Sequence, residues 1–191
     1  MSKGRLEAFS DGVIAILITI MVLGLPQPQG TTLAALAPLI PKLLIYAFSF
    51  IFLGIYWNNH HHPLQVVQQV NGAVLWANLH LLFWLSLVPF VTAWAGDNGL
   101  LPVPVSLYGF VLLLAAIAYF ILVRALLASH PRGSRLAAAI GNDAKGKISL
   151  LLYAMGIPAC YLHPLLGWAF YVVVALIWLV PDRRMERALS E

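Results

Sequence analysis

Asp11 has the clearest capacity for chemistry in this sequence, because it stands inside the first apolar run, at about residues 6–25. An ionisable side chain in a membrane-spanning helix costs about 2.5–3.5 kcal/mol on insertion scales, so it is a functional hypothesis by default. Arg5, Glu7 and Ser10 stand close to it. Asp11 is therefore expected either to have a partner inside the protein or to lie with Arg5 and Glu7 at the lipid headgroups, solvated by water.

A second polar group closes the next apolar run, where Trp57 is followed by His60, His61 and His62. Trp57 and His61 are four residues apart and would share one face of a helix. The alternative is that Trp57 is an interfacial anchor and the histidines form a solvated loop. Consecutive helical residues point in different directions, and no cluster of Cys, Asp or Glu supplies further ligands, so no metal site is predicted.

The polar residues do not form the pattern of an enzyme. Only seven acidic residues are present, and no paired carboxylates, nucleophile elbow or phosphate-binding glycine loop stands out. The single cysteine excludes an internal disulfide framework. No catalytic residue and no cofactor are predicted. Nucleic-acid binding is not expected either, because the basic residues form no dedicated patch.

The composition predicts an all-α, polytopic membrane protein. Of 191 residues, 61% are hydrophobic and 9% are charged, with a mean hydropathy of +0.87, whereas a soluble domain carries about 25% charged residues. Residues 1–191 are expected to form a single membrane domain of about six transmembrane helices. The last two runs are short for a hydrocarbon core of about 30 Å, which leaves a helical hairpin or a re-entrant segment open. The helices are expected at about 5–25, 41–60, 73–95, 105–124, 148–162 and 165–180.

The basic residues predict the orientation, because Lys and Arg concentrate on the cytoplasmic side. With six helices and a cytoplasmic N-terminus, only Lys42 falls outside, where it can snorkel to the interface. A multi-pass protein of the cell membrane with both termini in the cytoplasm is expected. A cleaved signal peptide is disfavoured, because Glu7 and Asp11 interrupt the first apolar run. The cytoplasmic basic residues are Lys3, Arg5, Arg124, Arg132, Arg135, Lys145, Lys147, Arg183, Arg184 and Arg187.

The first apolar run also has a stripe of residues along one side of the expected helix: Gly12, Ile16, Thr19, Ile20 and Leu23. At about 100° per residue these positions fall on one side of a helix, and Asp11 lies about 140° from Ile16. On its own, such a stripe is typical of helix packing or lipid contact, since membrane helices are apolar all round.

The segment from Arg5 to Ile16 resembles the signature of the transmembrane protein 175 family, the endosomal and lysosomal potassium channels and their bacterial six-helix relatives. The motif R-x3-F-S-D is matched by Arg5, Phe9, Ser10 and Asp11. The resemblance continues in L-G-x-Y-W-x-x-H-H at residues 53–61, and in Asn78 followed by Pro89-Phe90. From residue 105 onward only length and hydropathy match.

The resemblance implies a homotetrameric cation channel in the lipid bilayer, of an unusual type whose first helices line the pore. Potassium would pass an apolar constriction instead of rings of backbone carbonyls. The alternative functions are a proton-coupled secondary transporter using Asp11 and His61, and a non-conducting scaffold. By resemblance, Ile16 and Leu23 form apolar layers and Thr19 a layer for potassium preference. The motif and helix-bracing network would comprise Arg5, Phe9, Ser10, Asp11, Trp57 and His61.

Overall fold

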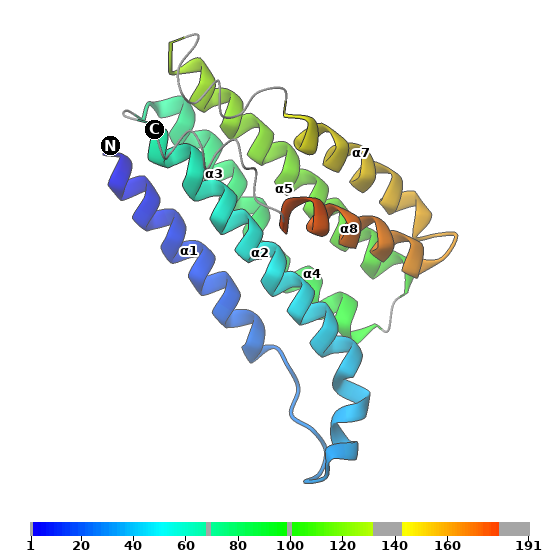
Figure 1. Cartoon of the computed structure of the whole chain (residues 1–191). Helices are drawn as coiled ribbons and strands as arrows, with labels where there is room; N and C mark the ends of the chain where they lie inside the picture. The colour runs from blue at the N-terminus through cyan, green and yellow to red at the C-terminus, as the bar shows by residue number, and fades with distance from the viewer. Residues whose placement is uncertain (1, 68–69, 99–100, 132–142, 180–191) are drawn as a thin grey trace.

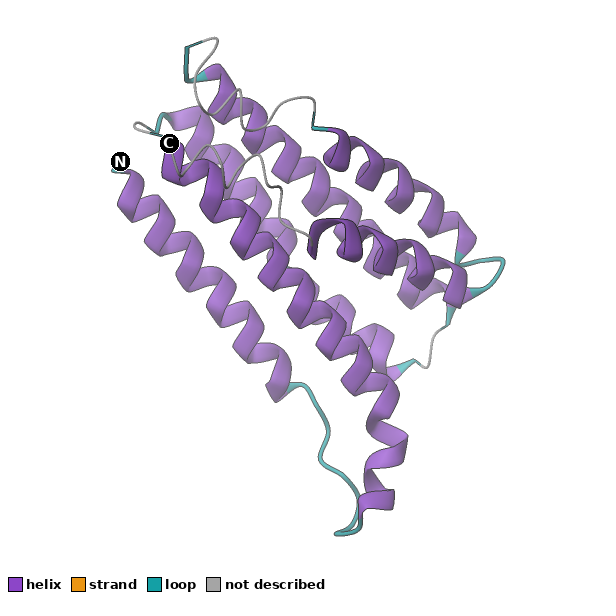
Figure 2. Ribbon diagram, viewed as in Figure 1, coloured by secondary structure: helices purple, strands orange, loops and turns teal. Residues whose placement is uncertain are grey.

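The structure, a computed structural model, describes residues 2–67, 70–98, 101–131 and 143–179 (Figure 1). All regular structure in these residues is helical, and Figure 2 shows helices and loops only. The expected all-α class is confirmed. In chain order the elements are α1 (Lys3–Leu23), the 3-10 helix η1 (Leu33–Leu39), α2 (Ile40–Val66), α3 (Gly72–Ser86), α4 (Val88–Asp97), α5 (Pro102–Ala128), α7 (Ala144–Ala159) and α8 (Pro164–Leu179).

Length and composition make most of these helices suitable for a membrane. Four stretches of the described residues are long and apolar enough to cross one: Lys3–Leu23, Leu33–Gln65, Gly72–Asp97 and Pro102–Ala128. α8 is a shorter apolar helix. α7 and α8 have 16 residues each, which at 1.5 Å per residue gives about 24 Å against a hydrocarbon core of about 30 Å. With these two, the described part contains the six helical segments that were expected.

Two boundaries differ from expectation by more than about one helical turn, and a proline lies at each. The third segment, expected as one helix over 73–95, breaks at Leu87 between α3 and α4. Pro89 has no N–H for the Leu85 carbonyl, and its ring crowds that same carbonyl. The break allows α4 to pack against α2 and α5 after α3 has packed along α5.

α2, expected to end near residue 60, continues through the histidines to Val66 although Pro63 lies inside it. Pro63 cannot donate to the carbonyl of Asn59, four residues earlier. The Tyr119 hydroxyl of α5 donates to that carbonyl instead, at 2.8 Å. The replacement hydrogen bond satisfies the freed backbone group, as membrane helices require, so the histidines stand on a helix and not in a loop.

α5 is the central helix of the bundle and packs against α3, α4, α7 and α8, whereas α1 lies at one edge and packs against α2, α3 and α4 (Figure 1). In the same view α1, α3 and α7 begin at the end of the bundle where α2 and α5 finish. Consequently α1 has neighbours from its own chain on one side only.

A buried hydrogen-bond cluster joins α2, α4 and α5. The Ser49 hydroxyl lies 2.7 Å from the Thr92 hydroxyl and 2.8 Å from that of Tyr108. All three side chains are buried, and Thr92 also donates to the Val88 carbonyl at 2.7 Å. Polar side chains that bond across helices hold membrane bundles together where the hydrophobic effect does not distinguish a neighbouring helix from lipid.

Glycines set the close approach of α5, α7 and α8. The fully buried ring of Tyr171 on α8 lies over Gly109 of α5 and over Gly156 of α7. A Cβ at Gly109 would overlap the Tyr171 hydroxyl, and a Cβ at Gly156 would lie 2.7 Å from its Cε1. Tyr171 therefore cannot move away from one glycine without meeting the other, and small residues at such contacts let helix backbones approach.

Gly109→Ala is expected to destabilise the bundle by about 1–3 kcal/mol, because the added methyl group must displace the trapped Tyr171 ring. The measurement is the melting temperature of the purified protein in mild detergent. Gly72→Ala, at a helical position with nothing within 4 Å of the added Cβ, is the control and should leave the melting temperature near that of the unsubstituted chain. Equal melting temperatures for both variants would contradict this packing argument.

Candidate functional site

α1 has one face that packs against other helices of the chain and an opposite face that does not. The buried face holds Leu6, Ser10, Ile14, Leu17 and Met21, which follow the spacing of three and four residues of a single helical side. This face lies against α2, α3 and α4. The rotation of α1 about its axis is thereby fixed.

The opposite face is the stripe that the sequence identified, which we call the α1 stripe. The side chain of Ile16 is 58% exposed and that of Leu23 is 82% exposed, and Gly12, Thr19 and Ile20 are exposed as well. Exposed apolar side chains on a membrane helix contact lipid or another chain, because water is absent from the hydrocarbon region. The stripe is therefore a surface that the other described residues of the chain leave uncovered.

Thr19 is the only stripe residue with a polar side chain. Its hydroxyl donates to the Ile16 carbonyl within the same helix, at 2.9 Å. A hydroxyl has one proton and two lone pairs, so this internal bond uses the proton and leaves the oxygen able to accept a hydrogen bond or approach a cation. Thr19 thus presents a partial negative charge between two apolar positions.

Asp11 has a partner inside the protein, as one of the two sequence hypotheses required. The Trp57 Nε1–H of α2 donates to Asp11 Oδ1 at 3.0 Å. The Trp57 ring is stacked on His61, with centroids 6.3 Å apart and an interplanar angle of 13°. The Gln65 amide nitrogen lies 2.6 Å from His61 Nε2. These contacts connect the N-terminal half of α1 to the C-terminal half of α2.

A second connection between the helices runs through His60, a residue that was not predicted to belong to the site. His60 is only 2% exposed, and its Nε2 lies 2.7 Å from Asn78 Oδ1 of α3. The Asn78 amide donates to the Ser10 hydroxyl at 2.9 Å, and Ser10 donates to the Leu6 carbonyl at 2.9 Å. We call Ser10, Asn78 and His60 the buried relay. It crosses α1, α3 and α2 in apolar surroundings.

One sequence signal could have revealed His60. It follows Leu53 and Tyr56, two buried residues of α2, at spacings of seven and four residues, which place all three on one helical side if the helix continues. The expected end of the helix near residue 60 concealed this. Asn78, one of the residues that carry the family resemblance, forms two hydrogen bonds with residues of other helices.

Arg5 and Phe9 are the two motif residues outside these contacts. Both are exposed, and the Arg5 side chain has no hydrogen bond or ion pair with any described residue. The neighbouring Lys3 does contact another helix, since its ammonium donates to the Gln65 carbonyl of α2 at 2.9 Å. It also lies 4.0 Å from the Glu7 carboxylate on α1. Among the described residues, therefore, Asp11, Trp57 and His61 are brought together, whereas Ser10 belongs to the separate connection through Asn78. Arg5 and Phe9 lie outside both.

Comparison with known proteins places this geometry in a family. The family model described as "Endosomal/lysosomal potassium channel TMEM175" matches residues 5–89. A protein of Chryseobacterium sp. (strain P1-3), named as a potassium channel, is 52% identical over 191 residues, which cover 100% of both chains. This chain belongs to the TMEM175 family. The resemblance seen in the R-x3-F-S-D motif is confirmed.

Solved and curated relatives extend the comparison. The crystal structure of a lysosomal potassium-selective channel TMEM175 homolog from Chamaesiphon minutus superposes with a TM-score of 0.80 at 28% identity, covering 93% of this chain and 96% of that one. The human endosomal/lysosomal proton channel TMEM175 is 36% identical over 86 residues, which are 39% of this chain and 17% of the human one. The family is one of ion channels and not an enzyme class, and the expected polytopic membrane fold is confirmed.

Asn78→Leu should destabilise the protein by about 1–3 kcal/mol, because it leaves the buried His60 Nε2 without its partner and removes the donor to the Ser10 hydroxyl. Trp57→Phe removes one hydrogen bond at a side chain that is 47% exposed and should cost less, about 0.5–1.5 kcal/mol. Melting temperatures in detergent measure both. If Asn78→Leu proved as stable as the unsubstituted chain, the buried relay would not be what holds α1 in place.

Proposed function

We propose that this chain is the subunit of a homotetrameric, potassium-permeable channel of the cell membrane, with the first helix of each subunit lining the pore. The observation that carries the proposal is the exposed α1 stripe on a helix held rigidly by its other face. Relatives named as potassium channels support the permeant ion. A single α1 at the edge of a bundle cannot enclose a pore, so several copies must contribute.

Ile16 is proposed as the narrowest point of this pore. Four inward-facing isoleucine side chains would make an apolar ring, which expels water when narrow and passes hydrated ions when wide. No charged side chain stands on the α1 stripe to compensate an ion that loses water there. The ring diameter would therefore control conductance, and Leu23 would add a second apolar layer about two helical turns further along α1.

Thr19 is proposed to set the preference for potassium. Its hydroxyl proton is held by the Ile16 carbonyl, so four threonine oxygens would face a passing ion as acceptors. These oxygens would lie next to the apolar ring, where an ion is partly dehydrated and an acceptor has most effect.

Ser10, Asp11, Trp57 and His61 are proposed to brace the pore helix rather than to contact the permeant ion. Asp11 is only partly exposed and bonded to Trp57, on a different side of α1 from the stripe. Arg5 and Phe9 are exposed at the same end of α1, and we propose that they make their contacts with neighbouring subunits. Trp57 contacts both Asp11 and His61, and an indole cannot carry a proton between them, which favours a passive channel over a proton-coupled transporter.

We further propose that the end of the bundle where α1 begins faces the cytoplasm. The described basic residues at that end are Lys3, Arg5, Arg124, Lys145 and Lys147, in keeping with the excess of Lys and Arg in cytoplasmic segments. Lys42 lies at the opposite end, 2.6 Å from Asp97. The other basic residues expected on the cytoplasmic side, Arg132, Arg135, Arg183, Arg184 and Arg187, lie outside the described residues.

The proposal as a whole is tested with the purified protein in potassium-loaded liposomes. We expect potassium efflux that needs no proton gradient, and a dominant tetramer by native mass spectrometry in mild detergent. Protein-free liposomes are the control. A dominant monomer or dimer would overturn the assembly, and uptake that saturates and follows an imposed pH gradient would identify a transporter.

Ile16→Ala is expected to raise potassium flux severalfold and to weaken discrimination among monovalent cations, because a smaller side chain widens and wets the ring. Ile16→Asn should also raise flux. The control is Val22→Ala, which shortens an exposed side chain of α1 that lies off the stripe. If neither Ile16 variant changes flux while Leu23→Ala does, the constriction lies at Leu23.

Thr19→Val should shift the reversal potential toward a lower preference for potassium over sodium while current persists, because it removes the acceptor oxygen and keeps a branched side chain. Thr19→Ser keeps the oxygen and is the matched control. Reversal potentials are measured in bilayers under opposed potassium and sodium gradients. An unchanged preference in Thr19→Val would remove Thr19 from the selectivity layer.

A further inference from the structure

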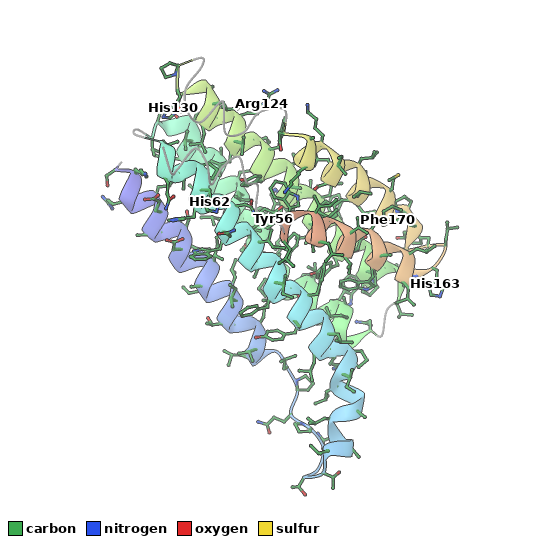
Figure 3. The ribbon with its side chains drawn as sticks, in the orientation of Figure 1. Tyr56, His62, Arg124, His130, His163 and Phe170 are labelled. Atoms are coloured by element: carbon green, nitrogen blue, oxygen red, sulfur yellow. The ribbon has the colours of Figure 1, made fainter. Side chains whose placement is uncertain are left out.

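A cavity lies between α2, α5, α7 and α8, on the part of the bundle away from α1. It comprises about 520 Å³ of space free of atoms, including its open mouth. Six aromatic side chains line it: Phe52, Tyr56, Tyr119, Phe120, Tyr153 and Trp178. Figure 3 shows Tyr56 on the side of α2 that faces α8. A largely apolar pocket with a few converging polar groups is the usual form of a small-molecule site.

Two of the cavity's hydroxyl groups have no partner. Tyr56 is 9% exposed and Tyr153 is 1% exposed, and neither hydroxyl forms a hydrogen bond with another residue of the described part. Tyr119, by contrast, is satisfied by the Asn59 carbonyl. Both hydroxyls line the cavity and are not among the fully enclosed unpaired polar atoms of the described residues. The two phenols are therefore available to a group that enters the cavity.

A carboxylate stands at the mouth of the same cavity. Asp143 caps the N-terminus of α7, with its Oδ1 accepting from the Gly146 N–H at 3.2 Å. Its backbone has φ 43° and ψ 46°, a left-handed conformation that is uncommon for residues other than glycine. Strained residues of this kind concentrate at functional sites.

Gly146 leaves room for the Asp143 carboxylate, because a Cβ on residue 146 would lie 2.6 Å from both carboxylate oxygens. Burial raises the pKa of Asp143, although the Gly146 N–H, Lys147 and Arg124 act in the opposite direction. Arg124, which Figure 3 labels, lies 5.3 Å from the ring centroid of Phe120, another residue of the cavity wall. Asp143 therefore places a carboxylate at the mouth of a cavity lined mainly by aromatic and apolar side chains.

We propose that this cavity binds a protonated amine with an aromatic body, the ammonium group beside Asp143 at the mouth and the body between the aromatic rings, with the hydroxyls of Tyr56 and Tyr153 in the cavity wall. Aromatic faces attract cations as well as apolar groups. A lipid acyl chain offers no polar group to the two hydroxyls or to the carboxylate, and Asp143 disfavours an anion. An organic ammonium ion with an aromatic body complements both the carboxylate and the aromatic walls.

The site is separate from the proposed pore. On α2, Phe52 and Tyr56 face the cavity, whereas Trp57 and His61 stand roughly opposite them on the helix, toward α1. Binding can therefore be measured whether or not the protein conducts potassium. A pore variant and a cavity variant also distinguish this site from an organic cation lodged among the α1 helices.

The test is isothermal titration calorimetry of the purified full-length protein in mild detergent with three probes of similar shape and different charge. We expect phenethylammonium to bind, neutral phenylpropanol to bind about tenfold more weakly, and anionic hydrocinnamate not to bind measurably. Asp143→Asn should weaken phenethylammonium about tenfold, and Tyr56→Phe and Tyr153→Phe should each weaken it about threefold to tenfold.

Two controls separate a binding role from a structural one. Tyr56→Phe and Tyr153→Phe should not lower the melting temperature, because the hydroxyls they remove have no partner among the described residues. Tyr161→Phe, at an exposed residue beyond α7, and Thr19→Val, on the α1 stripe, should leave binding unchanged. Equal binding of all three probes, an undiminished affinity in Asp143→Asn, or loss of binding in Thr19→Val alone would overturn the proposal.

Discussion

The orientation of α1 depends on one chain of hydrogen bonds in apolar surroundings, from Ser10 through Asn78 to His60. A polar group left unpaired in such surroundings is costly, so only a rotation of α1 that keeps Ser10 against Asn78 is stable. A shift of one residue would turn the helix by about 100° and expose Ser10. The outward direction of Ile16, Thr19 and Leu23 follows from this one constraint.

α2 connects the α1 side of the bundle to the side formed by α5, α7 and α8, because it contacts helices of both. Trp57 and His60 bind elements of the α1 side, and Tyr56 lies in the wall of the cavity formed with α5, α7 and α8. The glycine contacts of Tyr171 make that second side tightly packed. The chain therefore consists of a packed helical bundle with α1 at its edge, and the outer face of α1 is not covered by the other described helices.

Prolines show most clearly where sequence reasoning reached its limit. Pro63 and Pro89 both stand within helical segments, and each removes a backbone donor. Pro63 leaves α2 intact because the Tyr119 hydroxyl donates a hydrogen bond to the freed Asn59 carbonyl. Near Pro89, by contrast, the helix is interrupted at Leu87. The difference comes from a side chain on another helix, 60 residues away in the sequence. No local pattern contains that information. Because the second helix was expected to end near residue 60, His60 was left out of the predicted site.

The sequence by itself determined the membrane class, the number of helical segments, the α1 stripe and the R-x3-F-S-D family signature, because apolar composition and helical periodicity act locally along the chain. Only the tertiary structure decided which side of α1 is free, that Asp11 bonds Trp57, and that His60 and Asn78 support Ser10. It alone also brought Tyr56, Tyr153 and Asp143 to one cavity. Those relationships join residues of separate helices, and their geometry exists only once the helices have packed.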